Sequence, residues 1–205
     1  MKYLSREFFM QDVRRVAEKL LDTWLIRDFP GGGRLIGRIV ETEAYAHTDD
    51  PASHSSKGKT PRNAVMFGPA GHLYVYFTYG MHFCCNVVTA AEGRGEAVLL
   101  RALEPLEGIP RMALNRYGKE NISERELKDL CRGPARLCRA FAIGREQNGT
   151  DLCGGEIRIG EGDAISKLPI ARSSRIGIRE GRSHLWRFYF QNDPWISGPV
   201  KDRLI

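Results

Sequence analysis

The sequence of 205 residues has no hydrophobic run long enough to span a membrane, no CxxC cysteine pair and no glycine-rich motif for a nucleotide phosphate. Without an apolar span, and without an apolar N-terminal stretch that ends in a cleavage site, we expect an intracellular protein that is neither secreted nor membrane-inserted. The five cysteines are odd in number, which disfavours structural zinc and favours buried, reduced thiols. The missing GxGxxG and GxxxxGK motifs leave nucleotide-cofactor chemistry without support.

What the sequence does contain is enough apolar material for one core and a small positive charge. Hydrophobic residues make up 42% of the chain, and its length suits a single domain over residues 1–205. Lysine and arginine number 31 against 25 aspartates and glutamates, for a net charge of +6. Such a balance favours polyanionic partners, because each phosphate neutralised by a basic side chain releases counterions. The excess is too small to decide the partner by itself.

The spacing of apolar residues and turn signals predicts both helices and strands. An amphipathic helix is predicted over residues 5–24, where apolar side chains recur at helical spacing. Residues 46–72 are polar and rich in Gly, Pro and Ser, and we expect a long loop, which in compact domains is often functional. Strands are predicted at 34–45, 73–89, 96–103, 156–160, 174–178 and 185–190, and further helices at 108–117, 123–131 and 133–144.

The joins between these elements indicate the fold class. Gly80 divides the segment 73–89 into two strands, as expected of a hairpin or bulge. Ser123 and Glu126 form a capping-box pattern, and Pro134 marks the start of another helix. Hairpin-like joins outnumber strand–helix–strand units. We therefore predict an α+β fold, a single mixed domain with a curved, mainly antiparallel β-sheet core flanked by helices.

Residues 41–56, ETEAYAHTDDPASHSS, gather an unusual set of polar groups directly after a predicted strand. Strand alternation puts Glu41, Glu43 and Tyr45 on one face, where neighbouring side chains lie roughly 6.6 Å apart. Two carboxylates at such a separation suit the acid and base of a glycosidase. They would equally suit a solvated strand end, so the pattern alone leaves both interpretations open.

The same stretch could hold a metal ion. Four of its side chains offer nitrogen or oxygen ligands, namely His47, Asp49, Asp50 and His54. Their spacing matches neither a zincin nor an EF-hand, and Pro51 with the nearby serines is equally typical of a turn. The sequence therefore predicts no metal site here.

Further candidate residues lie in the strands that follow. Tyr74 and Tyr76 share one face of a predicted strand, where they could stack on a planar ligand or pack in the core. Tyr79 lies beside the glycine break and could be an exposed wedge. Asn86 interrupts an apolar run, which suits either a turn or a pocket wall. Arg101 ends another apolar run, as a salt-bridged arginine or a donor to a carboxylate or water.

Six segments occur in a specific order along the chain: RIVETEAY, DPASHSSKGKTPRNAVMF, LYVYFTYGMHFCCNVV, EAVLLRALEPLEG, LCRGPARLCRAFAI and RIGI. Together they resemble the alkyladenine (3-methyladenine) DNA glycosylase family, from about residue 4 to residue 200, most loosely between 145 and 170. The resemblance implies a monofunctional enzyme that hydrolyses the N-glycosidic bond of a damaged purine.

The resemblance also implies one water-activating carboxylate. Glu43, from TEAY, would be the general base that deprotonates the attacking water. Arg101, from LLRAL, would hold the water and the carboxylate, helped by the backbone carbonyl of Ile176 in RIGI. Glu41 has no catalytic role in this pattern, so it would be scaffold, as would the polar residues of 47–50.

The remaining implied roles concern a base rotated out of the duplex. Tyr45, His54 and Tyr76 would form the walls of the pocket for the flipped base. Asn86 would reject guanine by a clash with its 2-amino group. Tyr79 would enter the minor groove and fill the vacated stack, which partly offsets the cost of extruding a base.

The expected function is therefore excision of alkylated or deaminated purines, such as 3-methyladenine, hypoxanthine and ethenoadenine, from double-stranded DNA. We expect a monomer that needs no cofactor, in the cytoplasm or nucleoid of a prokaryotic cell. A non-catalytic binder of distorted duplex DNA is an alternative that charge and a Tyr79 wedge would suit equally. A carbohydrate-active or metal-dependent hydrolase that uses Glu41, Glu43 and the histidine loop is a third.

Overall fold

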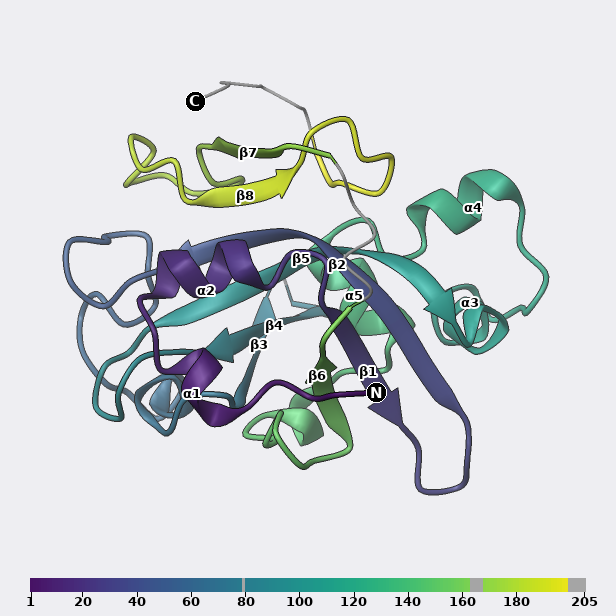
Figure 1. Cartoon of the computed structure of the whole chain (residues 1–205), viewed down its shortest axis with the longest axis horizontal. Coiled ribbons are helices and arrows are strands. Elements are labelled where there is room, and N and C mark those ends of the chain that lie inside the picture. Colours follow the sequence, from purple (N-terminus) through teal and green to yellow (C-terminus); the bar gives the residue numbers. More distant parts are fainter. Residues whose placement is uncertain (79, 163–167, 199–205) are drawn as a thin grey trace.

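The computed structural model describes residues 1–78, 80–162 and 168–198, and Figure 1 shows its ribbon. Its strands are β1 (Trp24–Asp28), β2 (Arg34–Tyr45), β3 (Leu73–Thr78), β4 (His82–Val88), β5 (Ala97–Glu107), β6 (Ile157–Gly160), β7 (Ile170–Ser173) and β8 (Arg187–Phe190). Its helices are α1 (Arg6–Phe9), α2 (Val13–Lys19), α3 (Ile109–Tyr117), α4 (Glu124–Asp129) and α5 (Pro134–Ala140), with 3-10 helices at Ala64–Phe67 and Arg145–Gln147.

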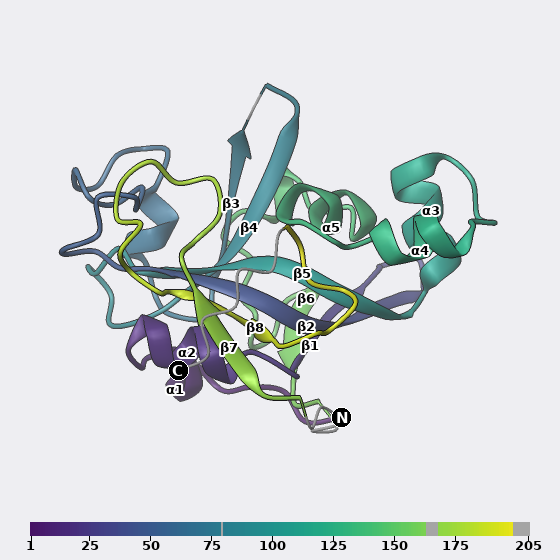
Figure 2. The same ribbon diagram turned by 90° about the horizontal axis from the view of Figure 1, so that it is seen from above.

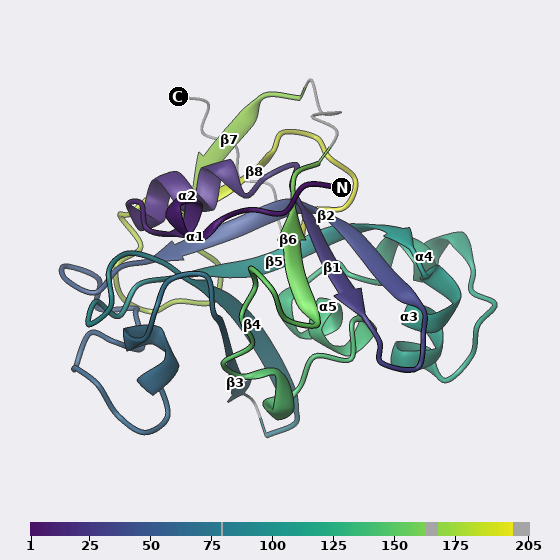
Figure 3. The ribbon, with the colours of Figure 1, turned by 60° about the horizontal axis from the view of Figure 1, so that its bottom comes forward.

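The strands belong to one curled sheet, visible in Figure 3. Its order is β3, β4, β5, β2, β1, β6, and β8 pairs with both β2 and β7. Each of the pairings between these strands is antiparallel. The prediction of an α+β domain with a curved, mainly antiparallel sheet is confirmed.

Strand β2 is the centre of the sheet because its two edges meet three partners. One edge pairs with β5, while the other pairs with β1 over residues 34–38 and then with β8 over residues 41–43. The register with β5 shifts on both sides of Glu41. Such irregularities bend a strand and redirect its side chains. The bend therefore coincides with the place where β2 changes partner.

The single helix predicted over residues 5–24 is wrong. The structure has two short helices, and the carboxylate of Asp12 caps the second by accepting hydrogen bonds from backbone N–H groups of its first turn. Trp24 begins β1, a strand that the sequence analysis did not anticipate. Apolar spacing did not reveal the break, because α2 still turns an apolar face to the core.

The other predicted helices are confirmed as α3, α4 and α5. Ser123 and Glu126 form the expected reciprocal capping box, and α5 begins at Pro134 but ends at Ala140, short of the end that Gly144 was predicted to mark. Helix α2 packs on β2 and β5, and α5 packs on β4 and β5. Figure 2 shows α1 and α2 on one side of the sheet and α3 to α5 on the other. Among the described residues, none of the helices has the length and apolarity to cross a membrane.

Strands β3 and β4 form the predicted hairpin, which projects from the sheet beside α5 (Figure 2). Its register places Tyr76 opposite Cys84. Near its tip, Phe77 and Met81 are 42% and 72% exposed. Tyr79, the predicted wedge, lies outside the described residues. The described part of the tip thus presents apolar side chains to solvent.

The strand predicted at 174–178 is also wrong. Strand β7 ends at Ser173, and the residues that follow leave the sheet. Both guanidinium Nη atoms of Arg175 lie 2.6 Å from the carboxylate of Asp50, in the long loop 46–72 that the sequence predicted. The backbone N–H of Ile176 donates to Glu43. The carboxylates of Asp50 and Glu43 thus satisfy the Arg175 guanidinium and the Ile176 N–H. These groups therefore need no hydrogen bonds from a neighbouring strand.

Candidate active site

The carboxylate of Glu43 lies on β2 and is fully buried. Its Oε1 accepts a hydrogen bond from the Ile176 backbone N–H at 2.7 Å and lies 3.3 Å from Arg101 Nη1. Its Oε2 accepts a hydrogen bond from the Tyr45 hydroxyl at 2.9 Å. Donors on both oxygens hold the carboxylate in one orientation. The alternative of two solvated glutamates at a strand end is therefore wrong.

Glu41 is also fully buried, and it connects two arginines. Its Oε1 accepts hydrogen bonds from Arg101 Nε at 3.1 Å and Arg187 Nε at 2.6 Å, while Oε2 accepts one from the Ser197 N–H at 2.5 Å. Arg101 thus bridges both carboxylates. Burial opposes the charge of Arg101, but Glu43 and then Glu41 outweigh it and raise its pKa. In a glycosidase, the acid and the base lie on either side of the substrate. Here both glutamates contact one arginine, which does not fit that arrangement.

An aromatic wall stands across from these charged groups, on β3 and the loop before it. The rings of Tyr74 and Tyr76 are stacked with centroids 5.6 Å apart, so the predicted shared face is confirmed. The His54 ring meets Tyr76 edge-on at 4.6 Å, and its Nδ1 lies 3.1 Å from the Tyr74 hydroxyl. Burial, and then the charge of Arg62, lowers the pKa of His54. This wall is therefore uncharged at neutral pH.

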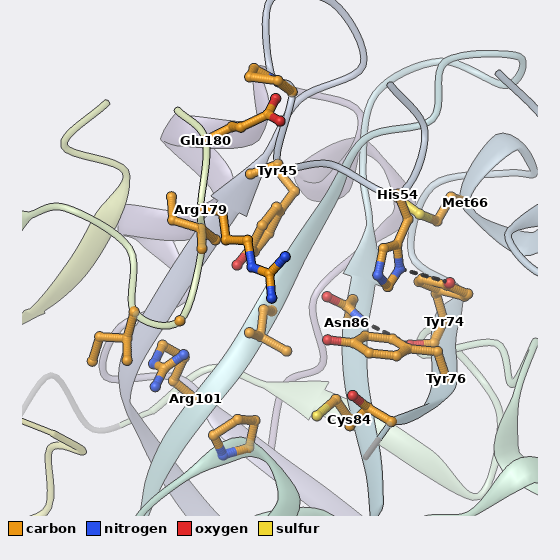
Figure 4. A pocket seen from close by; sticks show the side chains of 18 residues that line it. Tyr45, His54, Met66, Tyr74, Tyr76, Cys84, Asn86, Arg101, Arg179 and Glu180 are labelled. Carbon is orange, nitrogen blue, oxygen red and sulfur yellow. Dashed lines mark hydrogen bonds between the residues drawn. The ribbon is translucent and has the colours of Figure 1, made fainter. Parts of the chain in front are cut away.

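Between the wall and β2 lies a cavity of about 430 Å³, a volume typical of small-molecule sites. Figure 4 shows Tyr45 on one side of the cavity and Tyr76 on the other, with Arg101 below. The amide nitrogen of Asn86 donates to the Tyr74 carbonyl at 3.2 Å, which fixes this side chain in the cavity wall. The space suits a planar group held between aromatic faces.

The structure brings together most of the residues predicted from the sequence. Six of them line the cavity: Tyr45, His54, Tyr76, Asn86, Arg101 and Ile176. Glu43 lies behind them, in contact with three of the six groups. The backbone N–H of Ile176 contacts Glu43, whereas the resemblance had implied a role for its carbonyl beside the attacking water, which stays a prediction. Their catalytic and binding roles remain predictions.

The polar residues of the loop after β2 point elsewhere. The Asp50 carboxylate is fully occupied by Arg175 and by the backbone N–H groups of Ala46 and Ala52. The His47 ring packs edge-on against Phe67 at 5.4 Å. Within residues 1–78, 80–162 and 168–198, no three His, Cys, Asp or Glu side chains are grouped to hold a metal ion. Asp50 thus acts as scaffold for the loop that carries Ile176.

Several cavity residues were missed by sequence analysis. Cys84 faces Tyr76 across the hairpin, so the register could have found it. Burial raises the pKa of the Cys84 thiol to about 11. Arg179 and Glu180 reach the cavity from the loop after β7, and nothing in their local sequence signals this. Arg187 does not line the cavity but donates to Glu41. The sequence predicted it only as part of a strand, although it is among the most buried side chains.

Comparison with known proteins gives consistent matches over almost the whole chain. The family model described as "Methylpurine-DNA glycosylase (MPG)" matches residues 7–194. A protein of Carboxydothermus hydrogenoformans is 52% identical over 195 residues, covering 95% of this chain and 98% of the relative. Proteins of Burkholderia lata and Desulfitobacterium hafniense are 49% and 43% identical, over 98% and 96% of this chain and 93% and 99% of their own lengths. All three relatives carry the name "Putative 3-methyladenine DNA glycosylase".

Proposed function

Because the chain belongs to the methylpurine-DNA glycosylase family, we propose that it hydrolyses the N-glycosidic bond of alkylated or deaminated purines in double-stranded DNA. Its substrates would include 3-methyladenine, the base in the names of its relatives, together with hypoxanthine and ethenoadenine. Residues 1–205 would act as one monomeric glycosylase domain inside the cell, without a cofactor.

The observation that carries this proposal is the fixed carboxylate of Glu43 beside the cavity. A general base must lie within hydrogen-bonding reach of the proton that it removes, and must keep its orientation. Tyr45, Arg101 and the Ile176 N–H supply that orientation. Glu43 would then deprotonate a water molecule for attack on the sugar carbon. Its negative charge would also stabilise the oxocarbenium-like transition state.

The cavity walls support a purine as the bound group. Tyr45 and Tyr76 lie on opposite sides of the cavity in Figure 4, and aromatic faces attract a positively charged methylated purine by about 0.5–2 kcal/mol per ring. Such a base is already a good leaving group, so a single general base suffices. Asn86, fixed in the wall, would exclude guanine through its 2-amino group.

For the duplex itself we propose Tyr79 as the wedge. A base inside a helix is out of reach, so it must be extruded at a cost of a few kcal/mol. An inserted side chain that replaces the lost stacking offsets part of this cost. The proposal rests on the family resemblance, and the exposed Phe77 and Met81 nearby support an apolar contact with DNA.

The decisive variant is Glu43→Gln, which keeps the shape of the side chain and removes the base. We expect it to bind lesion-containing duplex but to excise the base at least about 10²-fold more slowly in single-turnover assays, the scale of general-base catalysis. Asp49→Asn, at an exposed carboxylate of the neighbouring loop, is the matched control and should behave as wild type. Undiminished excision by Glu43→Gln would eliminate the mechanism.

The wild-type protein distinguishes this proposal from a non-catalytic binder. It is incubated with duplexes that contain ethenoadenine or hypoxanthine, and abasic sites are then cleaved with alkali. Strand breaks are expected, and a chelator should leave their yield unchanged. Tight binding without any strand breaks would favour the non-catalytic binder of distorted DNA.

A further inference from the structure

Arg179 differs from the other arginine of the cavity in having no anionic partner among the described residues. Arg101 is paired with Glu41 and Glu43, which neutralise it. Arg179 lines the same cavity from the exposed loop after β7, and no hydrogen bond or ion pair joins it to any residue that the structure describes. Its charge is therefore available to a ligand.

The guanidinium of Arg179 points into the cavity. Figure 4 shows it beside Tyr45, in the space that separates Tyr45 from Tyr76. Glu180 lies at the rim, and its carboxylate is directed away from the guanidinium (Figure 4). A planar cation in this position lies within reach of any planar group that enters between the two tyrosines.

The surrounding walls leave this charge uncompensated. Burial is the main reason that the pKa values of Tyr45 and Tyr76 are raised and that of His54 is lowered, so all three rings are neutral at neutral pH. A positively charged base would gain attraction from the rings but would meet repulsion from Arg179. A neutral base would meet none.

We propose that Arg179 is a specificity-determining residue that favours neutral purines with adjacent N7 and O6 acceptors, as in hypoxanthine, over cationic methylated purines. The inference deepens the proposed function and rests on it. Arginine donates two parallel hydrogen bonds to N7 and O6 of a purine. Adenine has an amino donor in place of O6, and a purine methylated at N7 lacks that acceptor and carries a positive charge.

Arg179 alone would accept undamaged guanine, because guanine has the same N7 and O6 acceptors as hypoxanthine. The two bases differ by the 2-amino group, which is the group that Asn86 is proposed to exclude. Both residues line the same cavity. Arg179 would select a base with the N7 and O6 acceptors, and Asn86 would reject a base with a 2-amino group. Together they single out a deaminated adenine.

The test compares single-turnover excision of two bases by wild type and Arg179→Gln. One duplex carries hypoxanthine opposite thymine, and the other carries 3-methyladenine opposite thymine, a cationic base that has neither the O6 acceptor nor the 2-amino group that Asn86 would exclude. The variant should excise hypoxanthine about 10-fold more slowly or worse, the discrimination expected of one bidentate arginine contact. Excision of 3-methyladenine should be unchanged or faster. Arg179→Lys keeps the charge without the paired donors, so it should also slow hypoxanthine excision while leaving 3-methyladenine excision unchanged.

Arg182→Gln is the matched control, because Arg182 is exposed on the same loop but does not line the cavity. It should leave the ratio of the two rates unchanged. Equal slowing of both substrates by Arg179→Gln would overturn the inference and would favour a general DNA contact. Wild-type rates of the variant on both substrates would also overturn the inference, because Arg179 would then have no role in excision. A wild-type protein that excises 3-methyladenine but not hypoxanthine would overturn this inference alone. Failure to excise any damaged purine would overturn the proposed function as well.

Discussion

At the scale of single residues, two buried glutamates on one strand have different surroundings. Glu43 is held mainly by neutral donors, the Tyr45 hydroxyl and the Ile176 N–H, with Arg101 at 3.3 Å. Glu41 lies closer to charge, because Nε atoms of Arg101 and Arg187 both donate to one of its oxygens. Glu41 therefore neutralises buried cations, whereas Glu43, the proposed general base, is held in one orientation.

This difference predicts which glutamate matters more for stability. In Glu41→Gln, the buried Arg187 loses the carboxylate that pairs with it and Arg101 keeps only Glu43, and breaking a buried ion pair from one side costs about 3–5 kcal/mol. In Glu43→Gln, Arg101 still has Glu41, so the loss should be smaller. Urea unfolding of both variants measures the two free energies. Equal losses of unfolding free energy in the two variants would contradict this prediction and would show that both carboxylates contribute equally to stability.

Local sequence predicted the catalytic candidates but not their burial. The alternation of β2 placed Glu41 and Glu43 on one face without choosing between them, and the family resemblance carried by TEAY, LLRAL and the other segments singled out Glu43 and Arg101. Burial of Glu41 depends on Arg101 and Arg187, which lie 60 and 146 residues away along the chain. A pattern read over a few residues contains no information about such partners. Solvated glutamates were a reasonable but wrong alternative for that reason.

At the scale of elements, the loop after β2 and the segment after β7 are joined by a buried ion pair. The side chains of Asp50 and Arg175 are both completely buried. Arg175 also lies over the rings of Tyr45 and Trp186, at 4.6 and 5.1 Å from their centroids. This contact positions the next residue, Ile176, whose N–H holds Glu43. The pair thus connects loop structure to the candidate base.

Removal of Arg175 should therefore affect both stability and excision. Arg175→Ala leaves the charge of Asp50 buried and unpaired, at a cost of about 3–5 kcal/mol. Excision should slow as well, because Glu43 loses a fixed donor. Adding Asp50→Asn to Arg175→Ala should recover part of the stability, since the unpaired charge is then gone. A double variant less stable than Arg175→Ala in urea unfolding would contradict this explanation.

The elements that were predicted wrongly share a physical cause. The break between α1 and α2 depends on a capping contact of Asp12, which leaves the apolar spacing intact. Residues 174–178 have the apolar and β-branched content of a strand, but their polar groups bind Asp50 and Glu43 instead. Periodicity detects the face that is buried. It does not detect side-chain contacts that end an element or replace its backbone partners.

At the scale of the whole molecule, the cysteines show how far the core excludes solvent. Four of the five thiols are buried, and Cys153 is only partly so. Burial raises the pKa of Cys84 to about 11 and that of Cys131 to about 12. The expectation of buried thiols made from the odd cysteine count agrees with this arrangement for all but Cys153.

Thiol labelling should therefore report on folding. At pH 8 we expect an alkylating reagent to modify Cys153 first, because the thiolate is the reactive form, Cys153 is the most exposed of the five thiols, and burial raises the pKa of Cys84 in the cavity wall to about 11. Raising the pH toward 11 should increase the labelling rate of Cys84 more than that of Cys131, whose pKa is higher. Mass spectrometry of digested protein identifies the modified positions. In denaturant all five should react, and rapid modification of Cys131 in the native protein would contradict the closed core.

The partners of the β2 glutamates come from segments far apart along the chain, so they are synthesised at different times. Residues up to β6 leave the ribosome first, and they include β1, β5 and both glutamates. The groups that complete the carboxylate environment come last, since the Ile176 N–H, Arg187 and the Ser197 N–H all follow β7. Of the groups that hold Glu43, Tyr45 and Arg101 precede β6 and the Ile176 N–H follows β7. A growing chain therefore lacks this last donor until the segment after β7 closes over the sheet. With Glu43 as the proposed base, an unfinished chain would be a poorer enzyme than the finished one, so the order of the sequence itself limits excision of bases by incomplete chains.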